Sequence, residues 1–362
     1  MNFAKLESLY EKYERRASSF ALLAGFIFDN LTLKRIDLLF ENLIMLSYLV
    51  ISGGGIALLN YFHEYPPQRS FLARVENLLP LFIQFTFGGL FSAFFIFYYR
   101  GGAFSSSWPF MVILLFLLVG NEFFRNYYRR LVFQVSIYFL AIFSFFIFFV
   151  PVVLKSMGAG IFLLSGAVSL LSMYLFSRAL LKFVPRRYED HKIHLRNSVL
   201  IIFVTINALY FLNLIPPIPL SLKEGGVYHS VERSAGNYTV LGEKKKWHEK
   251  LLFFMPETVS LKPGAPLYVF SSVFAPTDLN TRIIHDWQYY DYGVKEWASA
   301  SKVTFAITGG RVEGYRGFSR KENLSEGKWR VDVKTERNQI IGRVRFNIEP
   351  RTGEVELEEK VF

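Results

Sequence analysis

The chain changes its hydrophobic pattern sharply near residue 220. Before that point it consists mostly of long uncharged runs of Phe, Leu, Ile and Val, and after it charged residues recur every few positions. A run of about 20 apolar residues is long enough to cross a bilayer as a helix, whereas alternation with a period of two is typical of β-strands. The sequence therefore predicts a multi-span transmembrane domain over residues 1–220 and a β domain over residues 221–362.

Six apolar segments have the length and composition of membrane-spanning helices. They are Ile36–Leu59, Leu78–Tyr98, Phe104–Phe124, Leu131–Leu154, Ala159–Phe176 and Ser198–Leu220. A seventh candidate, Ala17–Leu33, has a shorter apolar core that Asp29 and Asn30 interrupt. The run Gly53–Gly55 inside the segment 36–59 indicates either a close contact between helices or a local break.

The distribution of Lys and Arg between the connecting segments favours seven spans. If Ala17–Leu33 spans, 15 of these residues lie on the side of the N-terminus and 4 lie on the other side, whereas without it the two sides hold 8 and 11. Cytoplasmic loops carry the excess of Lys and Arg in membrane proteins. We therefore expect an integral protein of the inner or cytoplasmic membrane with a cytoplasmic N-terminus and an extracytoplasmic C-terminal domain, and the bilayer as its first partner.

Composition excludes several classes of function. The net charge is +11, but residues 1–221 hold 19 Lys and Arg against 11 Asp and Glu, so most of the excess lies in the apolar half. Membrane orientation explains that excess, and we expect no nucleic acid partner. The chain has no cysteine, which excludes disulfides, thiol catalysis and cysteine-ligated metals. We expect no cofactor.

The C-terminal half has the pattern of short strands. Trp329–Lys334 and Val344–Ile348 alternate strictly between apolar and polar residues, and Leu267–Phe274 is apolar on both faces, as a central strand would be. Gly-containing turn signals such as Pro263-Gly264 separate these runs. The pattern predicts eight or nine strands in an all-β antiparallel sandwich, immunoglobulin-like in broad architecture.

An ordered set of short motifs runs from about Thr281 to Ile348. It comprises His285-x-Trp287, Gly309-Gly310-Arg311, Gly314-Tyr315-Arg316, Ser319-x-Lys321, Gly327-x-Trp329-x-Val331-x-Val333 and Ile341-Gly342-Arg343-x-x-Phe346. This region resembles a bacterial family known as domain of unknown function 2914, and the preceding multi-span region is similar to what accompanies that domain in bacterial envelope proteins. The resemblance implies a location in the cell envelope, and it implies no activity and no catalytic residues.

Two groups of residues in the β domain are candidates for binding. Five aromatic residues lie within eleven positions: Trp287, Tyr289, Tyr290, Tyr292 and Trp297. They predict either a platform that stacks on a sugar or peptide, or part of the core. The second group, which includes Arg316 and Lys321, predicts either an anion site or solvated surface charge.

Polar residues near the predicted spans are candidates for a functional path through the membrane. They are Asp29, Asp37, Glu41, Glu122 and Arg125. Ionisable groups in spans are often functional, and the alternative interpretation is fixed structural pairs at the interfaces. The spacing Asp190-His191-x-x-His194 suits a metal, but we expect no metal site because no further ligand is apparent.

The sequence leaves two function classes open. We favour a non-enzymatic envelope protein whose β-sandwich binds a protein or a glycan, because residues 222–362 contain no G-x-S-x-G and no histidine cluster. The alternative is a membrane-embedded transporter or lipid-processing enzyme in which the sandwich is accessory. A sensor is unsupported, because the longest cytoplasmic segment, of about 20 residues, is too short for an output domain.

Overall fold

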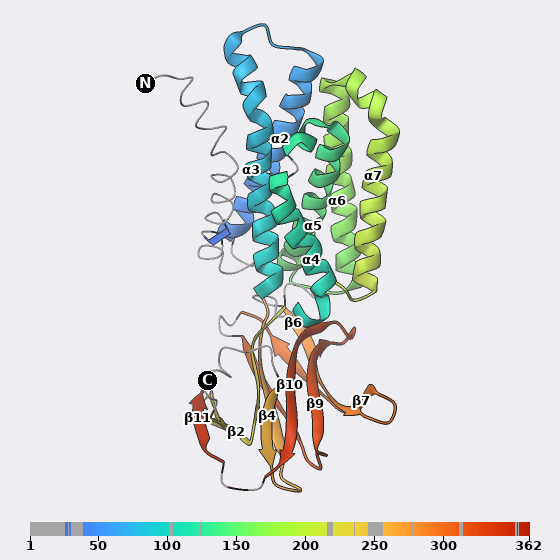
Figure 1. Cartoon of the computed structure of the whole chain (residues 1–362). Helices are drawn as coiled ribbons and strands as arrows, with labels where there is room; N and C mark the ends of the chain where they lie inside the picture. The colour runs from blue at the N-terminus through green and yellow to red at the C-terminus, as the bar shows by residue number, and fades with distance from the viewer. Residues whose placement is uncertain are drawn as a thin grey trace, which may run out of the picture. The chain divides into compact units, whose positions relative to one another are not determined.

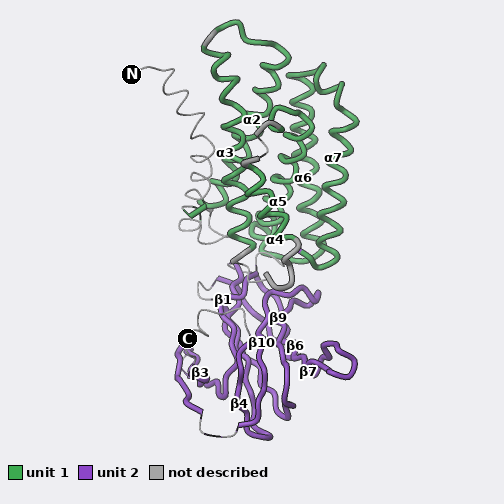
Figure 2. The backbone as a smooth tube through the Cα atoms, in the orientation of Figure 1, with its two compact units in different colours: residues 1–99, 109–214 green, residues 100–108, 215–362 purple. Residues whose placement is uncertain are grey.

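The computed structural model describes most of the chain. The described residues are 26–27, 29, 39–100, 104–123, 125–215, 220–234, 236–244, 256–276, 279–310, 314–351, 353 and 355–362, without the side chains of 39, 70, 99–100, 104–109, 122–123 and 125–126. They form two compact units, one of residues 1–99 and 109–214 and the other of residues 100–108 and 215–362 (Figure 2). We call them the helical unit and the β unit and describe each by itself.

The described part of the first 214 residues holds six α-helices of 20 to 31 residues (Figure 1). They are α2 (Leu39–Glu64), α3 (Ser70–Arg100), α4 (Phe104–Phe123), α5 (Leu131–Leu154), α6 (Ala159–Phe183) and α7 (Pro185–Phe211), with the short 3-10 helix η1 (Arg125–Arg129) before α5. Five of them are long and apolar enough to cross a membrane, and α4 contributes a shorter apolar stretch, Phe110–Asn121.

Each of the six predicted apolar segments contains a helix, but their bounds and their number need correction. The predicted count of seven spans is not supported, because the candidate Ala17–Leu33 lies almost wholly outside the described residues. Helix α7 begins at Pro185, thirteen residues before the predicted start at Ser198, and ends at Phe211 rather than at Leu220. Proline is favoured at the first helical position, and the charged residues that follow are compatible with a helix that continues beyond its apolar part.

The helical unit exposes apolar side chains on its outside. Of the 40 exposed large apolar side chains in the described part of the chain, 35 lie before residue 213. Helix α5 is the inner helix: it contacts α2, α6 and α7, and most of its side chains are buried. A water-soluble protein rarely exposes apolar surface on this scale.

Two of the three glycines at Gly53–Gly55 allow close approach between helices. A Cβ atom on Gly53 would collide with the hydroxyl of Tyr138 on α5, and one on Gly55 would lie 3.0 Å from Cγ1 of Ile83 on α3. Helix α2 runs unbroken through this segment. Of the two interpretations that the sequence left open, close helix contact is therefore the one that the structure supports.

A chain of buried polar side chains links four helices of this unit. Asn60 Nδ2 on α2 donates to Gln134 Oε1 on α5 at 2.6 Å, and Gln134 Nε2 donates to the carbonyl of Tyr128 in η1 at 2.5 Å. The Tyr128 hydroxyl donates to Asn121 Oδ1 on α4, and Asn121 and Gln84 of α3 exchange hydrogen bonds with each other's carbonyls at 3.0 Å. Every polar side chain in this buried polar chain is neutral, which keeps the cost of its burial low.

The described residues of the β unit form eleven strands in three sheets. The strands are β1 (Ser221–Tyr228), β2 (Ser230–Ser234), β3 (Asn237–Glu243), β4 (Glu257–Leu261), β5 (Leu267–Phe274), β6 (Asn280–Asp291), β7 (Glu296–Thr308), β8 (Tyr315–Lys321), β9 (Gly327–Thr335), β10 (Ile340–Pro350) and β11 (Leu357–Val361). The sheet orders are β1-β5-β8, β4-β10-β9-β6-β7 and β11-β3-β2. No helix lies in the described residues after 220.

This arrangement departs from the predicted antiparallel sandwich in three ways. The described part of the unit has eleven strands, more than the eight or nine predicted, a third sheet is present, and β4 pairs with β10 in parallel. The third sheet, of β2, β3 and β11, packs on the outward side of β5 through a cluster that contains Val240 and Phe270. Strand β5 is therefore covered on both faces, which explains why Leu267–Phe274 carries apolar residues on both faces.

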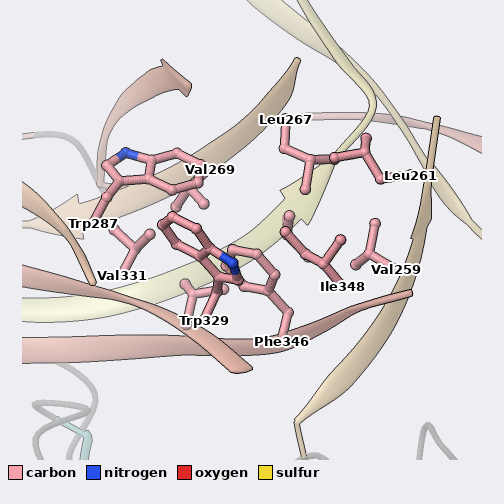
Figure 3. Packing of buried hydrophobic residues seen from close by; sticks show 11 residues of the cluster. Val259, Leu261, Leu267, Val269, Trp287, Trp329, Val331, Phe346 and Ile348 are labelled. Carbon is pink, nitrogen blue, oxygen red and sulfur yellow. The ribbon is translucent and has the colours of Figure 1, made fainter. Parts of the chain in front are cut away.

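The main core lies between the five-stranded sheet and the sheet β1-β5-β8 (Figure 3). Its fully buried centre includes Trp287 of β6, Val331 of β9, Phe346 of β10 and Val269 of β5. The ring of Trp287 packs edge-on against Phe346, with 6.2 Å between their centres. On the five-stranded sheet, Trp287, Val331 and Phe346 each alternate along the strand with polar neighbours, so the opposite side of that sheet is polar.

Candidate functional site: the polar face of the five-stranded sheet

Strand alternation distributes the aromatic candidates of β6 and β7 between the two sides of the five-stranded sheet. We call the side that points away from the core the outer face. It carries Asp286, Gln288, Tyr290, Trp297, Ser299, Lys302, Lys328, Arg330, Asp332, Lys334, Arg343 and Arg345. On β6, His285, Trp287 and Tyr289 point inward and Asp286, Gln288 and Tyr290 point outward, so neighbours in the sequence belong to different environments.

His285 is a sealed core residue on the inner side. It is fully buried, its Nε2 lies 2.8 Å from Ser271 Oγ, and its Nδ1 lies 2.8 Å from Ser319 Oγ. Ser319 Oγ also accepts a hydrogen bond of 2.9 Å from Trp287 Nε1. Burial lowers the pKa of His285 to about 3, so the imidazole is neutral near pH 7. This group satisfies buried polar atoms, and it has no access for a substrate.

Two aspartates face each other at the centre of the outer face. Asp286 of β6 lies directly opposite Asp332 of β9, and both are buried. Asp286 accepts hydrogen bonds from Lys334 Nζ at 2.6 Å and from Ser299 Oγ at 2.7 Å. Arg343 forms a bidentate salt bridge with Asp332: its Nε donates to Oδ1, and its Nη2 donates to Oδ2 at 3.0 Å. Like charges in direct opposition destabilise a sheet, and these cations offset that repulsion.

The pKa of Asp286 reports this balance. Burial acts to raise it, but hydrogen bonds from Lys334, Ser299 and Gln288 and the charge of Lys334 together hold the pKa below its usual range. The carboxylate is therefore ionised near pH 7 and fixed in position. The arrangement is a rigid ionic layer across three strands of the sheet.

Arg330 connects this ionic layer to the aromatic residues. Its Nε donates to Gln288 Oε1 at 2.8 Å, and its guanidinium lies 4.3 Å from the ring centre of Trp297. Burial lowers the pKa of Arg330, and the positive charges of Arg343 and Arg345 lower it further against the opposing effect of Asp332. The surroundings of this guanidinium are thus rich in positive charge.

Three aromatic residues lie together at the turn end of β6 and β7. The rings of Tyr290 and Trp297 meet edge-on at 5.4 Å and those of Tyr290 and Tyr292 at 5.1 Å. Asp291 Oδ1 accepts a hydrogen bond of 2.7 Å from the backbone N–H of Gly293 and so fixes the turn. This hairpin projects beyond the neighbouring strands (Figure 1), and Tyr292 is 59% exposed.

The predicted binding residues do not form one site. Trp287 is core, and Tyr289 packs against that core beside Trp329, whereas Tyr290, Tyr292 and Trp297 gather on the outer face and its hairpin. Arg316 and Lys321 lie on β8 in a different sheet. Neither of them makes an ion pair within the described part of the chain.

The polar candidates of the helical unit are described only in part. Glu41 is buried in the first turn of α2, and Asp29 is partly buried. Asp37 lies outside the described residues, as do the side chains of Glu122 and Arg125. His191 and His194 lie on α7, and within the described ranges no three metal-binding residues come together.

One family model matches part of this chain, from the start of β6 to Ile348 in β10. Residues 280–348 match the family described as protein of unknown function (DUF2914). The DUF2914 region thus contains four of the five strands of the largest sheet and most of the outer face. The motifs that suggested this family in the sequence include His285, Trp287 and Ser319, which meet in the core.

Comparisons with other known proteins add no further argument. No curated protein matches the chain. Among solved structures, the alkylpurine DNA glycosylase AlkC of Pseudomonas fluorescens, bound to DNA with an abasic site analogue, is 8% identical and is matched over 85% of this chain and 99% of its own. The TM-score is 0.21, which is too low to indicate a common fold.

Sequence reasoning missed the ionic layer of the outer face. Asp286, Asp332, Lys334 and Arg343 were not among the candidates, although the strict alternation of Trp329–Lys334 assigns Arg330, Asp332 and Lys334 to one face. What the pattern does not contain is the register that sets Asp332 opposite Asp286 and Arg343. The proximity of Asp286 and Asp332 depends on pairing between strands β6 and β9, which lie far apart in the chain.

Proposed function

We propose that this chain is an integral membrane protein that presents its β unit on the extracytoplasmic side. The membrane part rests on the five long apolar helices and on the exposed apolar side chains that surround them. The amide side chains of the buried polar chain, such as Asn60, Gln134 and Gln84, are neutral and form hydrogen bonds within the helical unit, which suits a bilayer environment. With Ala17–Leu33 as a further span, the N-terminus is cytoplasmic.

The placement of the β unit follows from the connections between the described helices. Connections α2–α3, α4–α5 and α6–α7, with the adjoining helix ends, hold eleven Lys and Arg, and connections α3–α4 and α5–α6 hold two. The eleven are Arg69, Arg74, Arg125, Arg129, Arg130, Arg178, Lys182, Arg186, Arg187, Lys192 and Arg196. Helix α7 starts at the basic end and leads into β1 at its other end. With α4 as a further span, the positive-inside rule therefore favours a position of β1 outside, whether or not Ala17–Leu33 spans.

The function that the geometry supports best is binding of an envelope partner, protein or glycan, by the outer face of the five-stranded sheet. The observation that carries this proposal is the combination of a fixed ionic layer with a projecting aromatic hairpin. Aromatic residues and arginine dominate binding surfaces because they offer a large contact area at a small entropic cost. The rigid charges beneath them keep that surface preorganised.

Photo-crosslinking of the full-length protein in intact cells tests this proposal. A photoreactive amino acid replaces Tyr292 on the hairpin, and the matched control replaces Ser234, which is exposed on β2 of the third sheet. We expect position 292 to give discrete cross-linked products that position 234 does not give. Equal products, or none at both positions, would contradict binding through the outer face.

A membrane-embedded transporter or lipid-processing enzyme is the second candidate, and the burial of Glu41 favours it. This carboxylate is 4% exposed in a helix that we place in the bilayer, where ionisable groups are often functional. Replacement Glu41→Gln keeps the shape and removes the charge. A cellular phenotype lost with the protein level unchanged would support the second candidate, and an unaffected phenotype would favour the binding function.

A further inference from the structure

The outer face contains a pair of arginines in direct opposition. Arg345 of β10 lies directly opposite Arg330 of β9 in the antiparallel register. Asp332 is already engaged by Arg343 and approaches Arg330 only at 4.0 Å, and Arg345 makes no ion pair within the described residues. Like charges directly opposite each other cost stability, so this pair is a local defect that a bound anion would relieve.

The neighbouring charged row of the outer face does not neutralise the positive charge of this arginine pair. The next row across the sheet holds Arg343, Asp332, Asp286 and Lys302, and its two aspartates are matched by Arg343 and Lys334. Lys302 is exposed and makes no ion pair within the part of the chain that is described. No acidic side chain of these rows is left to compensate Arg345, so the uncompensated charge attracts acidic ligands.

The row on the other side of the arginines is aromatic. It contains Lys328, Tyr290 and Trp297, and Lys328 Nζ lies 5.7 Å from the ring centre of Tyr290. Two residues along a strand correspond to about 7 Å. A single sugar unit can therefore contact the aromatic row with its ring while an acidic substituent reaches the arginine row.

We propose that the outer face binds an acidic glycan, with a carboxylate or phosphate at Arg345 and Arg330 and a sugar ring against Tyr290 and Trp297. This inference rests on the proposed binding function and names the chemistry of its ligand. An acidic protein segment would satisfy the arginines alone, but the aromatic row one step away favours a repeating unit that carries both a ring and an acid. Arg330 is already oriented by Gln288 and Trp297, so little side-chain freedom is lost on binding.

The test uses the full-length protein in nanodiscs of uncharged phosphatidylcholine, with binding measured by calorimetry at 50 and 300 mM NaCl. The probes are oligogalacturonate, a neutral dextran oligomer of similar length and polyglutamate. The variant is Arg345→Gln. The control is Arg320→Gln. Arg320 is an exposed arginine of β8, which belongs to a different sheet from the outer face, and it forms an ion pair with Glu322.

We expect oligogalacturonate to bind at low salt, dextran to bind far more weakly, and Arg345→Gln to weaken oligogalacturonate binding by about fivefold while Arg320→Gln leaves it unchanged. Equal binding of dextran, or no effect of Arg345→Gln, would overturn the acidic-glycan inference. Arg345-dependent binding of polyglutamate alone would overturn the glycan and identify an acidic protein partner. If no probe binds but Tyr292 cross-links in cells, this inference fails and the proposed binding function stands.

Discussion

The helical unit and the β unit handle polar groups in opposite ways. The helical unit exposes its apolar side chains and buries a chain of neutral amides and hydroxyls, such as Asn60 and Gln134. The β unit buries apolar side chains and places its charges in matched groups on one face, such as Asp286 with Lys334. Each pattern suits a different solvent, because charges are costly in hydrocarbon and exposed apolar surface is costly in water.

The largest expected loss of unfolding free energy comes from removing one charged partner of the ionic layer. Replacement Asp332→Ala leaves Arg343 and Lys334 beside each other without the carboxylate that they share, and such buried charges cost about 3–5 kcal/mol when one partner is removed. We expect denaturant titration to show this loss of unfolding free energy in the β unit. The control Glu336→Ala breaks the exposed pair with Arg282 and should cost less than about 0.5 kcal/mol. Similar losses of unfolding free energy in both variants would show that the ionic layer contributes no more to stability than an exposed ion pair does.

A second prediction concerns the stability of the β unit against pH. The pKa of His285 is about 3 in the folded state and about 6.5 in the unfolded chain, so the unfolded state binds more protons between these values. The contribution of the neutral, buried imidazole to the free energy of unfolding is fully present above pH 6.5. It decreases as the pH falls, by about 2 kcal/mol at pH 5. Replacement His285→Gln should lower stability at pH 7 and flatten the slope between pH 7 and 5. An unchanged slope would show that His285 is not the group that titrates.

The buried polar chain gives a smaller effect in the helical unit. Replacement Gln134→Leu removes the hydrogen bonds to Asn60 and to the Tyr128 carbonyl. Interhelical hydrogen bonds in membranes are worth about 0.6–1.7 kcal/mol each, so we expect a loss of about 1–3 kcal/mol in detergent unfolding. Ser172→Ala is the control, because Ser172 bonds only to Val168 within its own helix. A loss no larger than that of the control would mean that the chain does not hold the helices together.

The smallest expected effect has the opposite sign. Arg345→Gln removes one member of the opposed arginine pair, and the relief of repulsion should stabilise the β unit by a few tenths of a kcal/mol. A variant that is more stable and binds oligogalacturonate more weakly would show that the arginine pair is retained for binding. Thermal unfolding of the full-length protein gives the measurement, and a clear destabilisation would mean that Arg345 has a structural role.

The local sequence pattern predicted the helices and strands whose formation depends on residues close together in the chain. Apolar runs became helices, and alternation at Trp329–Lys334 became a strand with one apolar and one charged side. Helix α7 begins before the predicted start at Ser198, because charged residues such as Arg186 and Lys192 do not end a helix that continues beyond its apolar part.

Pairing between distant strands was beyond the sequence pattern. The parallel pairing of β4 with β10 and the third sheet depend on chain reversals that no short motif encodes. The opposition of Asp286 and Asp332 likewise joins strands that are far apart in the chain, and the opposition of Arg330 and Arg345 depends on the register between the consecutive strands β9 and β10. The aromatic cluster could be predicted in part. Alternation places Trp287 and Tyr290 on opposite sides of the strand, but only the structure shows which side is the core.

Cysteine accessibility in intact cells tests the central claim, that the β unit faces the outside. The chain has no cysteine, so a single one at Lys262, exposed between β4 and β5, can be labelled with a membrane-impermeant maleimide. Its counterpart is a cysteine at Lys182, in the basic end of α6. We expect position 262 to react before lysis and position 182 only after it. Reaction of position 182 in intact cells, with position 262 protected until lysis, would contradict the account.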